Sequence, residues 1–371
     1  MSAVRHDPPF RAEHIGSLLR PPALLAARRA FDEGTVSAEG LRVEEDRWIR
    51  QAVALQERVG LRAVTDGEYR RGMWHIDFLE QIGGVEMREG TTTMTFQGVD
   101  FKPPSPHITG KVHHVKPIMG PDFSYLKSVA KETPKVCYPS PSLLHFRGGR
   151  GAISKDAYPD LAPFWTDLAK AYNDEMMSLA KLGCRYIQID ETDFAYLCDP
   201  KFRDMAKTLG EDPDKLPHTY AKLINESVKG RPADLAVCIH ICRGNFAGTW
   251  LAQGGYEPVA DALFNEIDVD GYFLEYDDAR SGGFEPLRFV PKGKKVVVLG
   301  LVTTKRPLLE SKDELKARIN EAAKYVPLEQ LAISPQCGFA SSHHGNPVTP
   351  DDQKKKLELV VSIAREVWGG V

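Results

Sequence analysis

The chain has 371 residues, of which 42% are hydrophobic and 27% charged, and this composition excludes a disordered or collagen-like protein. Lys and Arg number 48 against 51 Asp and Glu, a formal net charge of -3, so no basic excess indicates a nucleic-acid partner. No segment has the roughly 20 apolar residues of a membrane helix, and the first residues lack the apolar stretch of a secretory signal. We therefore expect a cytoplasmic protein with neither nucleic-acid nor membrane partners. The sequence does not determine its oligomeric state.

Eight short apolar runs predict β-strands and are spread over the whole chain. They are residues 14–19, 62–68, 135–144, 186–191, 235–242, 271–276, 295–302 and 331–338. Amphipathic segments separate them, and residues 37–60 and 159–183 repeat apolar side chains at helical spacing. Strands alternating with helices favour a (β/α)8 barrel over an open doubly wound sheet, because no glycine-rich nucleotide motif follows an early strand.

Two segments interrupt this alternation. Residues 85–115 are rich in Thr, Pro and Gly, which predicts an inserted hairpin and loop that walls or closes a site. Residues 192–217 predict an extended loop with a short helix after the fourth strand. With no linker or repeat in the sequence, we expect a single barrel domain over residues 1–371, with about the first ten residues forming an arm.

The active site of such a barrel lies at the carboxyl ends of the strands, and several of the predicted ends are polar. His240 and Cys242 are two residues apart on one strand, so both side chains can point into the barrel mouth. Glu275 and Cys337 end two further strands, and one nitrogen, two sulfurs and one oxygen suit a tetrahedral zinc ion. The alternative is that each is a buried core residue, since the six cysteines are scattered and a lone Cys is often a small hydrophobe.

The motifs HIGS, TDGE, QIDE, His-x-Cys, FLEY and CGF follow one another in this order along nearly the whole chain. In this the sequence resembles the catalytic barrel of the cobalamin-independent methionine synthases. HIGSLLRP, AVTDGEYRRGMWHIDFLE and YPSPSLLHFR are most similar to the short, single-barrel bacterial members. The resemblance implies a zinc-dependent methyltransferase that needs no cobalamin.

The resemblance also assigns roles to residues. It implies that His240, Cys242, Glu275 and Cys337 bind Zn2+. Gly16 and Ser17 would hold the carboxylate of homocysteine, and Glu68 and Asp190 its ammonium group, which needs hydrogen-bond acceptors. Glu68 can instead pair with Arg70 or Arg71, and Ser17 can instead cap a helix beginning near Pro21.

The implied reaction is S-methylation of homocysteine to methionine, in which zinc favours the nucleophilic thiolate. Asp190 and Lys305 are the predicted catalytic residues, and Lys305 occupies the position of a histidine proposed as the acid in full-length synthases. A lysine there can donate a proton or bind an anionic donor, so methyltetrahydrofolate as donor stays open. Trp74, His75, His145 and Arg147 are candidates for the donor side, although a packed Trp and a solvent-facing Arg are equally ordinary.

Three other functions remain open at this stage. One is another thiol alkylation of the same superfamily, such as opening of an epoxide by coenzyme M. The second is a zinc hydrolase, which is disfavoured because two thiolates lower the Lewis acidity of the metal. The third is a non-catalytic protein in which zinc only holds the structure together.

Overall fold

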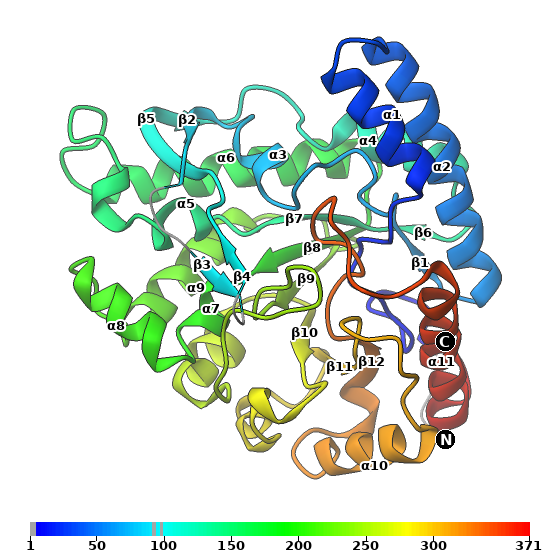
Figure 1. Ribbon diagram of the computed structural model, residues 1–371. Coiled ribbons are helices and arrows are strands. Elements are labelled where there is room, and N and C mark those ends of the chain that lie inside the picture. The colour runs from blue at the N-terminus through cyan, green and yellow to red at the C-terminus, as the bar shows by residue number, and fades with distance from the viewer. Residues whose placement is uncertain (1–4, 91–93, 97–98) are drawn as a thin grey trace.

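A parallel sheet occupies the centre of the computed structural model, which describes residues 5–90, 94–96 and 99–371. Its six strands pair in chain order: β7 (Val136–Pro139), β8 (Tyr186–Glu191), β9 (Ala236–Ile241), β10 (Gly271–Glu275), β11 (Val296–Val302) and β12 (Leu331–Pro335). Nearly every residue of these strands is buried, which explains why they read as continuous apolar runs rather than as alternating ones. Figure 1 shows helices surrounding the strands.

The strands predicted at the start of the chain are shorter than expected. β1 (Ala63–Val64) pairs in parallel with β6 (Thr133–Pro134), which leads into β7. The strand predicted over residues 14–19 is wrong: the chain makes one parallel bridge, Ala12 to Ile333, and then leaves strand geometry, with Gly16 at φ 144°. The predicted fold is confirmed as α/β with a parallel sheet, but a closed barrel ladder is not present within the described ranges.

The helices lie between the strands as expected. They are α1 (Pro22–Asp32), α2 (Ala38–Val59), α3 (Ile76–Leu79), α4 (Gly120–Val129), α5 (Leu143–Phe146), α6 (Ala162–Lys181), α7 (Asp193–Tyr196), α8 (Pro200–Thr208), α9 (Leu216–Ser227), α10 (Lys312–Ala322) and α11 (Pro350–Trp368). Short 3-10 or π turns occur at η1 (Gly149–Ala152), η2 (Glu257–Val259), η3 (Ala262–Glu266), η4 (Ala279–Ser281), η5 (Glu285–Phe289) and η6 (Leu328–Gln330). None of the helices in the described residues has the length and apolar character needed to cross a membrane.

Both long predicted helices are confirmed, and the ends of the first have identifiable causes. The Ser37 side chain accepts a hydrogen bond from the Gly40 amide at the start of α2. Gly60 ends this helix in the left-handed conformation, at φ 96°, which glycine adopts without the steric cost of a side chain. The second predicted helix corresponds to α6.

The inserted hairpin is also confirmed. β2 (Gly83–Arg88) pairs antiparallel with β5 (Ser105–His113), and between them β3 (Met94–Phe96) pairs with β4 (Val99–Phe101). Residues 91–93 and 97–98 of the predicted insertion, and residues 1–4 of the predicted arm, lie outside the described residues. Phe96 packs on Phe246 with ring centroids 5.5 Å apart, which places the insertion over the end of β9. The expected segment after the fourth strand contains α7 and α8.

Candidate metal centre and active site

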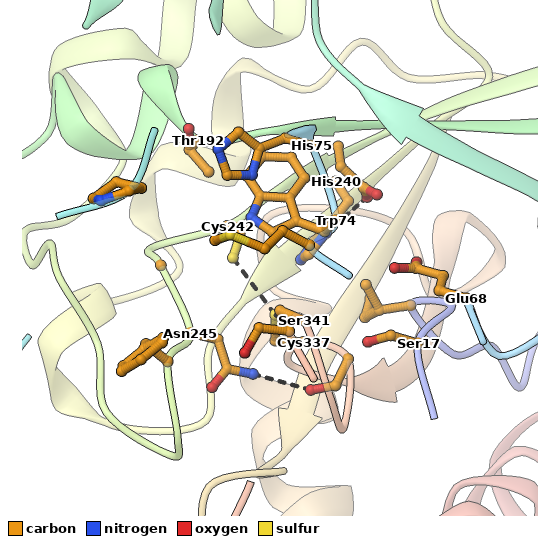
Figure 2. Close-up of a pocket in the computed structure, with 18 of the residues that line it drawn as sticks. Ser17, Glu68, Trp74, His75, Thr192, His240, Cys242, Asn245, Cys337 and Ser341 are labelled. Carbon is orange, nitrogen blue, oxygen red and sulfur yellow. Dashed lines mark hydrogen bonds and ion pairs between the residues drawn. The ribbon is translucent and has the colours of Figure 1, made fainter. Parts of the chain in front are cut away.

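The four predicted metal ligands come together at the carboxyl ends of three strands of the sheet, β9, β10 and β12. His240 lies in β9 and Cys242 just beyond it, Glu275 ends β10, and Cys337 follows β12. Their ligand atoms all lie within 4.8 Å of one another, and all four residues are buried. The two sulfurs are 3.5 Å apart, close to the spacing of about 3.5–4 Å between ligands around a tetrahedral zinc ion (Figure 2).

The His240 ring is oriented as a metal-binding imidazole requires. Its Nδ1 lies 3.2 Å from Oδ1 of Asp190, which also accepts a 2.7 Å hydrogen bond from the side chain of Gln188. Its Nε2 is buried and has no hydrogen-bond partner in the described part of the chain. A carboxylate that fixes the other ring nitrogen is the usual support of a metal-binding histidine, so the unsatisfied Nε2 fits a metal.

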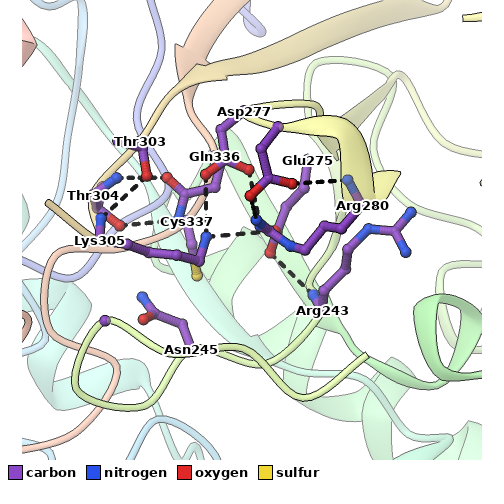
Figure 3. A network of polar contacts seen from close by, with 12 residues as sticks. Arg243, Asn245, Glu275, Asp277, Arg280, Thr303, Thr304, Lys305, Gln336 and Cys337 are labelled. Carbon is purple, nitrogen blue, oxygen red and sulfur yellow. Dashed lines mark hydrogen bonds and ion pairs between the residues drawn. The ribbon is translucent and has the colours of Figure 1, made fainter. Parts of the chain in front are cut away.

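Glu275 is held by a network of basic residues behind the cysteines (Figure 3). One carboxylate oxygen accepts from the Arg243 amide at 3.0 Å, and the other from the Arg280 guanidinium at 2.7 Å. Burial by itself raises the pKa of Glu275, but the Lys305 and Arg280 charges outweigh it and lower the pKa to about 2. The ligand oxygen is therefore anionic.

The two cysteine thiols share one hydrogen bond. This bond, together with burial, raises the pKa of Cys242 well above its usual value. The same bond lowers the pKa of Cys337 to about 7, although burial opposes the change. The shared hydrogen bond therefore favours the thiolate of Cys337, which is the form that a metal binds.

Glu68 lies beside this centre in an unusual backbone conformation. It has φ 59°, is buried, and its carboxylate lies 3.6 Å from the Arg71 guanidinium, so the alternative pairing with Arg71 is present. Burial raises the pKa of Glu68 to about 7, with Arg71 opposing and Asp190 adding to the shift. A buried carboxyl group of this kind is suited to an incoming cation.

Gly16 and Ser17 line the same end of the site. A Cβ at Gly16 would lie 2.8 Å from the Cys137 sulfur and 3.0 Å from a carboxylate oxygen of Glu68, so this position needs glycine. Ser17 does not cap α1, because the N-cap position of this helix is Pro21 and no side chain forms a cap hydrogen bond there. Its hydroxyl instead accepts a hydrogen bond from the Ala340 amide at 3.4 Å, so the Ser17 side chain lies against the loop that follows Cys337.

A half-open cavity connects several of these groups. Its wall includes Ser17, Glu68, Asp190, His240, Cys242 and Cys337, and, from the predicted donor side, Trp74, His75 and Arg147. The structure thus brings together most of the residues that the sequence analysis selected.

Four predicted residues are not part of the cavity wall: Gly16 and Glu275, which lie directly behind it, and His145 and Lys305. The His145 ring contacts the Tyr220 hydroxyl at 2.9 Å and the Glu211 carboxylate at 3.3 Å, away from the cavity wall. Lys305 is buried with its Nζ 3.3 Å from Asp277 and 3.8 Å from Glu275. A lysine in this position supports the Glu275 carboxylate and is not part of the cavity wall, and its role as a proton donor stays a prediction.

The sequence analysis missed the residues that surround Glu275 and those that close the cavity. Asp277 and Arg280 follow β10 directly, and Arg280 bonds to both Glu275 and Asp277. The charged residues that follow the FLEY motif in the sequence could have indicated Asp277 and Arg280. Phe96 and Asn245 line the cavity from segments without a strand-end position, so the sequence offered no comparable signal for them.

Residues 10–365 match the family model for the cobalamin-independent synthase catalytic domain. The chain belongs to this family. Its methyltransferase class is thereby confirmed, and the family agrees with the expectation that cobalamin is not used.

Several similar proteins are matched over most of their own length. The chain is 45% identical to the uncharacterized protein YxjG of Bacillus subtilis, over 99% of this chain and 97% of that protein. It is 27% identical to a methionine synthase of Pyrococcus horikoshii, over 88% and 85% of the two chains. A Listeria monocytogenes structure, named as a candidate vitamin-B12-independent methionine synthase, has a TM-score of 0.80 at 38% identity and covers 98% of this chain and 100% of that one.

Proposed function

We propose that the protein is a zinc-dependent S-methyltransferase that converts homocysteine to methionine. The observation that carries the proposal is the convergence of His240, Cys242, Glu275 and Cys337 beside a cavity that three of them line together with Glu68 and Asp190. A thiol-binding metal centre next to two acidic groups suits an amino acid that has a side-chain thiol. The name of the Pyrococcus horikoshii relative, methionine synthase, supports the same reaction.

The chemistry follows from the residues present. A bound zinc ion would favour the thiolate form of homocysteine and so supply the nucleophile. Asp190 orients His240 through the 3.2 Å contact and offers its carboxylate to the substrate ammonium group. Glu68 provides the second acceptor. Gly16 has no side chain, and this leaves the space that the Glu68 carboxylate occupies.

The acidic end of the cavity also separates homocysteine from thiols without an ammonium group. Coenzyme M has a sulfonate in place of the amino acid, and Glu68 and Asp190 would repel it. The acidic side chains therefore support methylation of homocysteine better than alkylation of coenzyme M. Hydrolysis is disfavoured because two of the four candidate ligands are cysteines, which reduce the Lewis acidity of the metal.

Calorimetry with matched thiols tests the proposal. Zinc-loaded protein is expected to bind homocysteine at least about tenfold more tightly than 4-mercaptobutyrate, which lacks only the amino group, because a charge-assisted hydrogen bond contributes about 1.5–3 kcal/mol. Glu68→Gln should remove most of this difference. Equal affinity for the two thiols, or preference for coenzyme M, would contradict the assignment of homocysteine.

A single catalytic domain over residues 1–371 and a cytoplasmic location stay predictions. We propose both, and we also propose that the protein binds neither nucleic acid nor membranes. Homocysteine and a methyl donor are the proposed partners of the enzyme.

A further inference from the structure

A line of buried polar side chains leads from the interior of the sheet to the metal centre. Lys135 and Glu13 form an ion pair at 3.3 Å, and neither side chain has any exposed surface. The same Lys135 ammonium group donates a hydrogen bond to the side-chain oxygen of Gln188 at 3.1 Å. Gln188 donates in turn to Asp190 at 2.7 Å, and Asp190 lies 3.2 Å from Nδ1 of His240. Hydrogen bonds therefore connect a buried ion pair with a candidate metal ligand.

The ion pair at the inner end of this line is held from several directions. One carboxylate oxygen of Glu13 accepts hydrogen bonds from the Tyr186 hydroxyl and the Phe10 amide, both at 2.9 Å. The other oxygen faces Lys135, which also donates to the His14 carbonyl. Removing one partner of a buried ion pair is costly, because it leaves an uncompensated charge. Lys135 is therefore a fixed hydrogen-bond donor.

The neighbours of Gln188 determine the orientation of its side-chain amide. An ammonium group can only donate hydrogen bonds, so the amide oxygen faces Lys135. A backbone carbonyl can only accept, and the amide nitrogen of Gln188 lies 2.6 Å from the Ile15 carbonyl oxygen. The amide nitrogen is thus fixed on the side of Asp190, and its second N–H group donates to that carboxylate.

This orientation of the amide determines how Asp190 meets His240. Oδ1 of Asp190 accepts from Gln188, and the same oxygen lies 3.2 Å from Nδ1 of the His240 ring. The ring therefore donates from Nδ1 and has its lone pair on Nε2, the nitrogen without a hydrogen-bond partner in the described residues. An imidazole binds a metal through an unprotonated nitrogen. The Gln188 amide thus supports the form of His240 that the metal centre needs.

Gln188 also contacts the amino-acid end of the cavity. The Ile15 carbonyl that it binds directly precedes Gly16 and Ser17, which the proposed function assigns to the homocysteine carboxylate. Asp190, its other partner, is assigned to the ammonium group. One buried side chain therefore contacts both parts of the proposed amino-acid site as well as the support of the metal ligand.

We propose that Gln188 is a positioning residue for the reaction and that the Lys135–Glu13 ion pair fixes its amide. This inference rests on the proposed function, which supplies the metal centre and the amino-acid site. Gln188 is fully buried and is not part of the cavity wall, so it acts through Asp190 and Ile15. A purely structural glutamine would only need satisfied hydrogen bonds, whereas a positioning glutamine needs a donor directed at Asp190.

Two substitutions of similar size remove this donor. Gln188→Glu keeps an acceptor for Lys135 but presents a carboxylate oxygen to Asp190, and Gln188→Met has no N–H group at all. We expect both to lower zinc affinity by about tenfold to a hundredfold, the effect of losing the support of a metal-binding histidine. Competition with a zinc chelator measures this. Calorimetry with zinc-loaded protein should show weaker homocysteine binding in both variants.

Gln330→Glu is the matched control for a buried glutamine. Gln330 is 4% exposed and donates to the Pro291 and Lys295 carbonyls at 3.0 and 2.8 Å. It precedes β12, whereas Cys337 follows this strand, so the control changes the opposite end of the strand. We expect Gln330→Glu to lose thermal stability and to keep its affinities for zinc and homocysteine.

A double variant separates positioning from a general loss of structure. Gln188→Glu combined with Asp190→Asn exchanges the amide and the carboxylate, so residue 190 can donate to residue 188 and still accept from His240. The double variant should bind zinc at least about tenfold more tightly than Gln188→Glu alone. Its homocysteine affinity should stay low, because the carboxylate for the ammonium group is absent. A purely structural role predicts instead that the losses of the two single variants add.

The outcomes distinguish the role of Gln188 from the proposed function. If the wild type binds zinc and homocysteine and Gln188→Met binds both equally well, the positioning role is refuted and the proposed function stands. A double variant that binds zinc more weakly than either single variant, or equal losses in Gln330→Glu, would also refute this role. Should Gln188→Glu fail to fold, Gln188→Met decides. A wild-type protein that binds no zinc or no homocysteine would overturn the proposed function and this proposal together.

Discussion

Asp190 and His240 link the amino-acid end of the cavity to the metal centre. The Asp190 carboxylate lies 3.2 Å from Nδ1 of His240, and the opposite ring nitrogen has no hydrogen-bond partner among the described residues, as a metal ligand requires. The same carboxylate lines the cavity beside Glu68. One side chain therefore both orients a metal ligand and faces the proposed ammonium group.

Asp190→Asn is expected to weaken both functions. Loss of a carboxylate that supports a metal-binding histidine lowers metal affinity by about tenfold to a hundredfold. Competition with a zinc chelator measures this, and calorimetry measures homocysteine affinity. Asp234→Asn is a suitable control, because Asp234 forms a surface pair with Arg185. Unchanged zinc affinity in Asp190→Asn would show that the contact does not support the metal.

Cys337→Ala should remove a metal ligand. We expect the zinc content of the purified variant, measured by mass spectrometry, to fall well below that of the wild type. Cys184→Ala is the matched control, because Cys184 is equally buried but bonds to the Tyr186 carbonyl away from the centre. The control should lose about 1 kcal/mol of stability and keep its zinc. Equal zinc contents in both variants would refute the ligand assignment.

The raised pKa of Glu68 predicts how homocysteine binding depends on pH. Because this pKa is about 7, the carboxylate is increasingly protonated below neutrality and attracts the ammonium group less. The homocysteine dissociation constant should rise as pH falls, by at most about tenfold per unit from this group. Glu68→Gln should bind weakly at all pH values and lose this part of the dependence. If Glu68→Gln shows the same dependence of homocysteine binding on pH as the wild type, Glu68 is not the source of this dependence.

Lys305→Gln separates support of the metal centre from acid catalysis. The change leaves Asp277 with Arg280 as its remaining basic partner, so we expect a loss of about 1–3 kcal/mol in stability and weaker zinc binding. Thermal unfolding and chelator competition measure these effects. If Lys305 is instead the acid, the variant retains its zinc and its thermal stability, and kcat falls with a changed pH profile.

Gly16→Ala should damage the amino-acid end of the site. The new Cβ would crowd the Cys137 sulfur and the Glu68 carboxylate, and φ 144° is a conformation that alanine rarely adopts. We expect a loss of about 1–3 kcal/mol in the free energy of unfolding and weaker homocysteine binding. Gly151→Ala is the control, since a Cβ there would meet nothing within 4 Å. Similar results for both variants would mean that Gly16 has no special role.

The sequence predicted those elements whose cause is local or repeated. β8 to β12 are buried over nearly their whole length, so they appear as mainly apolar runs, and residues at the ends of β8, β9, β10 and β12 reach the site. The ends of α2 are visible as Ser37 and Gly60 because caps act over a few residues. The metal ligands could be selected because strand ends of a parallel sheet meet at one edge.

The remaining features depend on packing beyond the strand ends. Residues 14–19 are apolar enough for a strand, but the backbone turns at Gly16 to make room for Glu68. Lys305 and His145 follow strands, yet each turns toward a buried partner and away from the cavity. The direction of a side chain after a strand ends is set by the loop and its neighbours, which periodicity does not describe.

Zinc K-edge absorption, recorded on protein purified without chelator, tests the central claim most directly. The fitted number of sulfur neighbours is compared before and after homocysteine is added. Two sulfurs from Cys242 and Cys337 should increase to about three when the substrate thiolate enters the four-coordinate shell. Absence of zinc, or a sulfur number that homocysteine leaves unchanged, would contradict a thiol-activating metal centre.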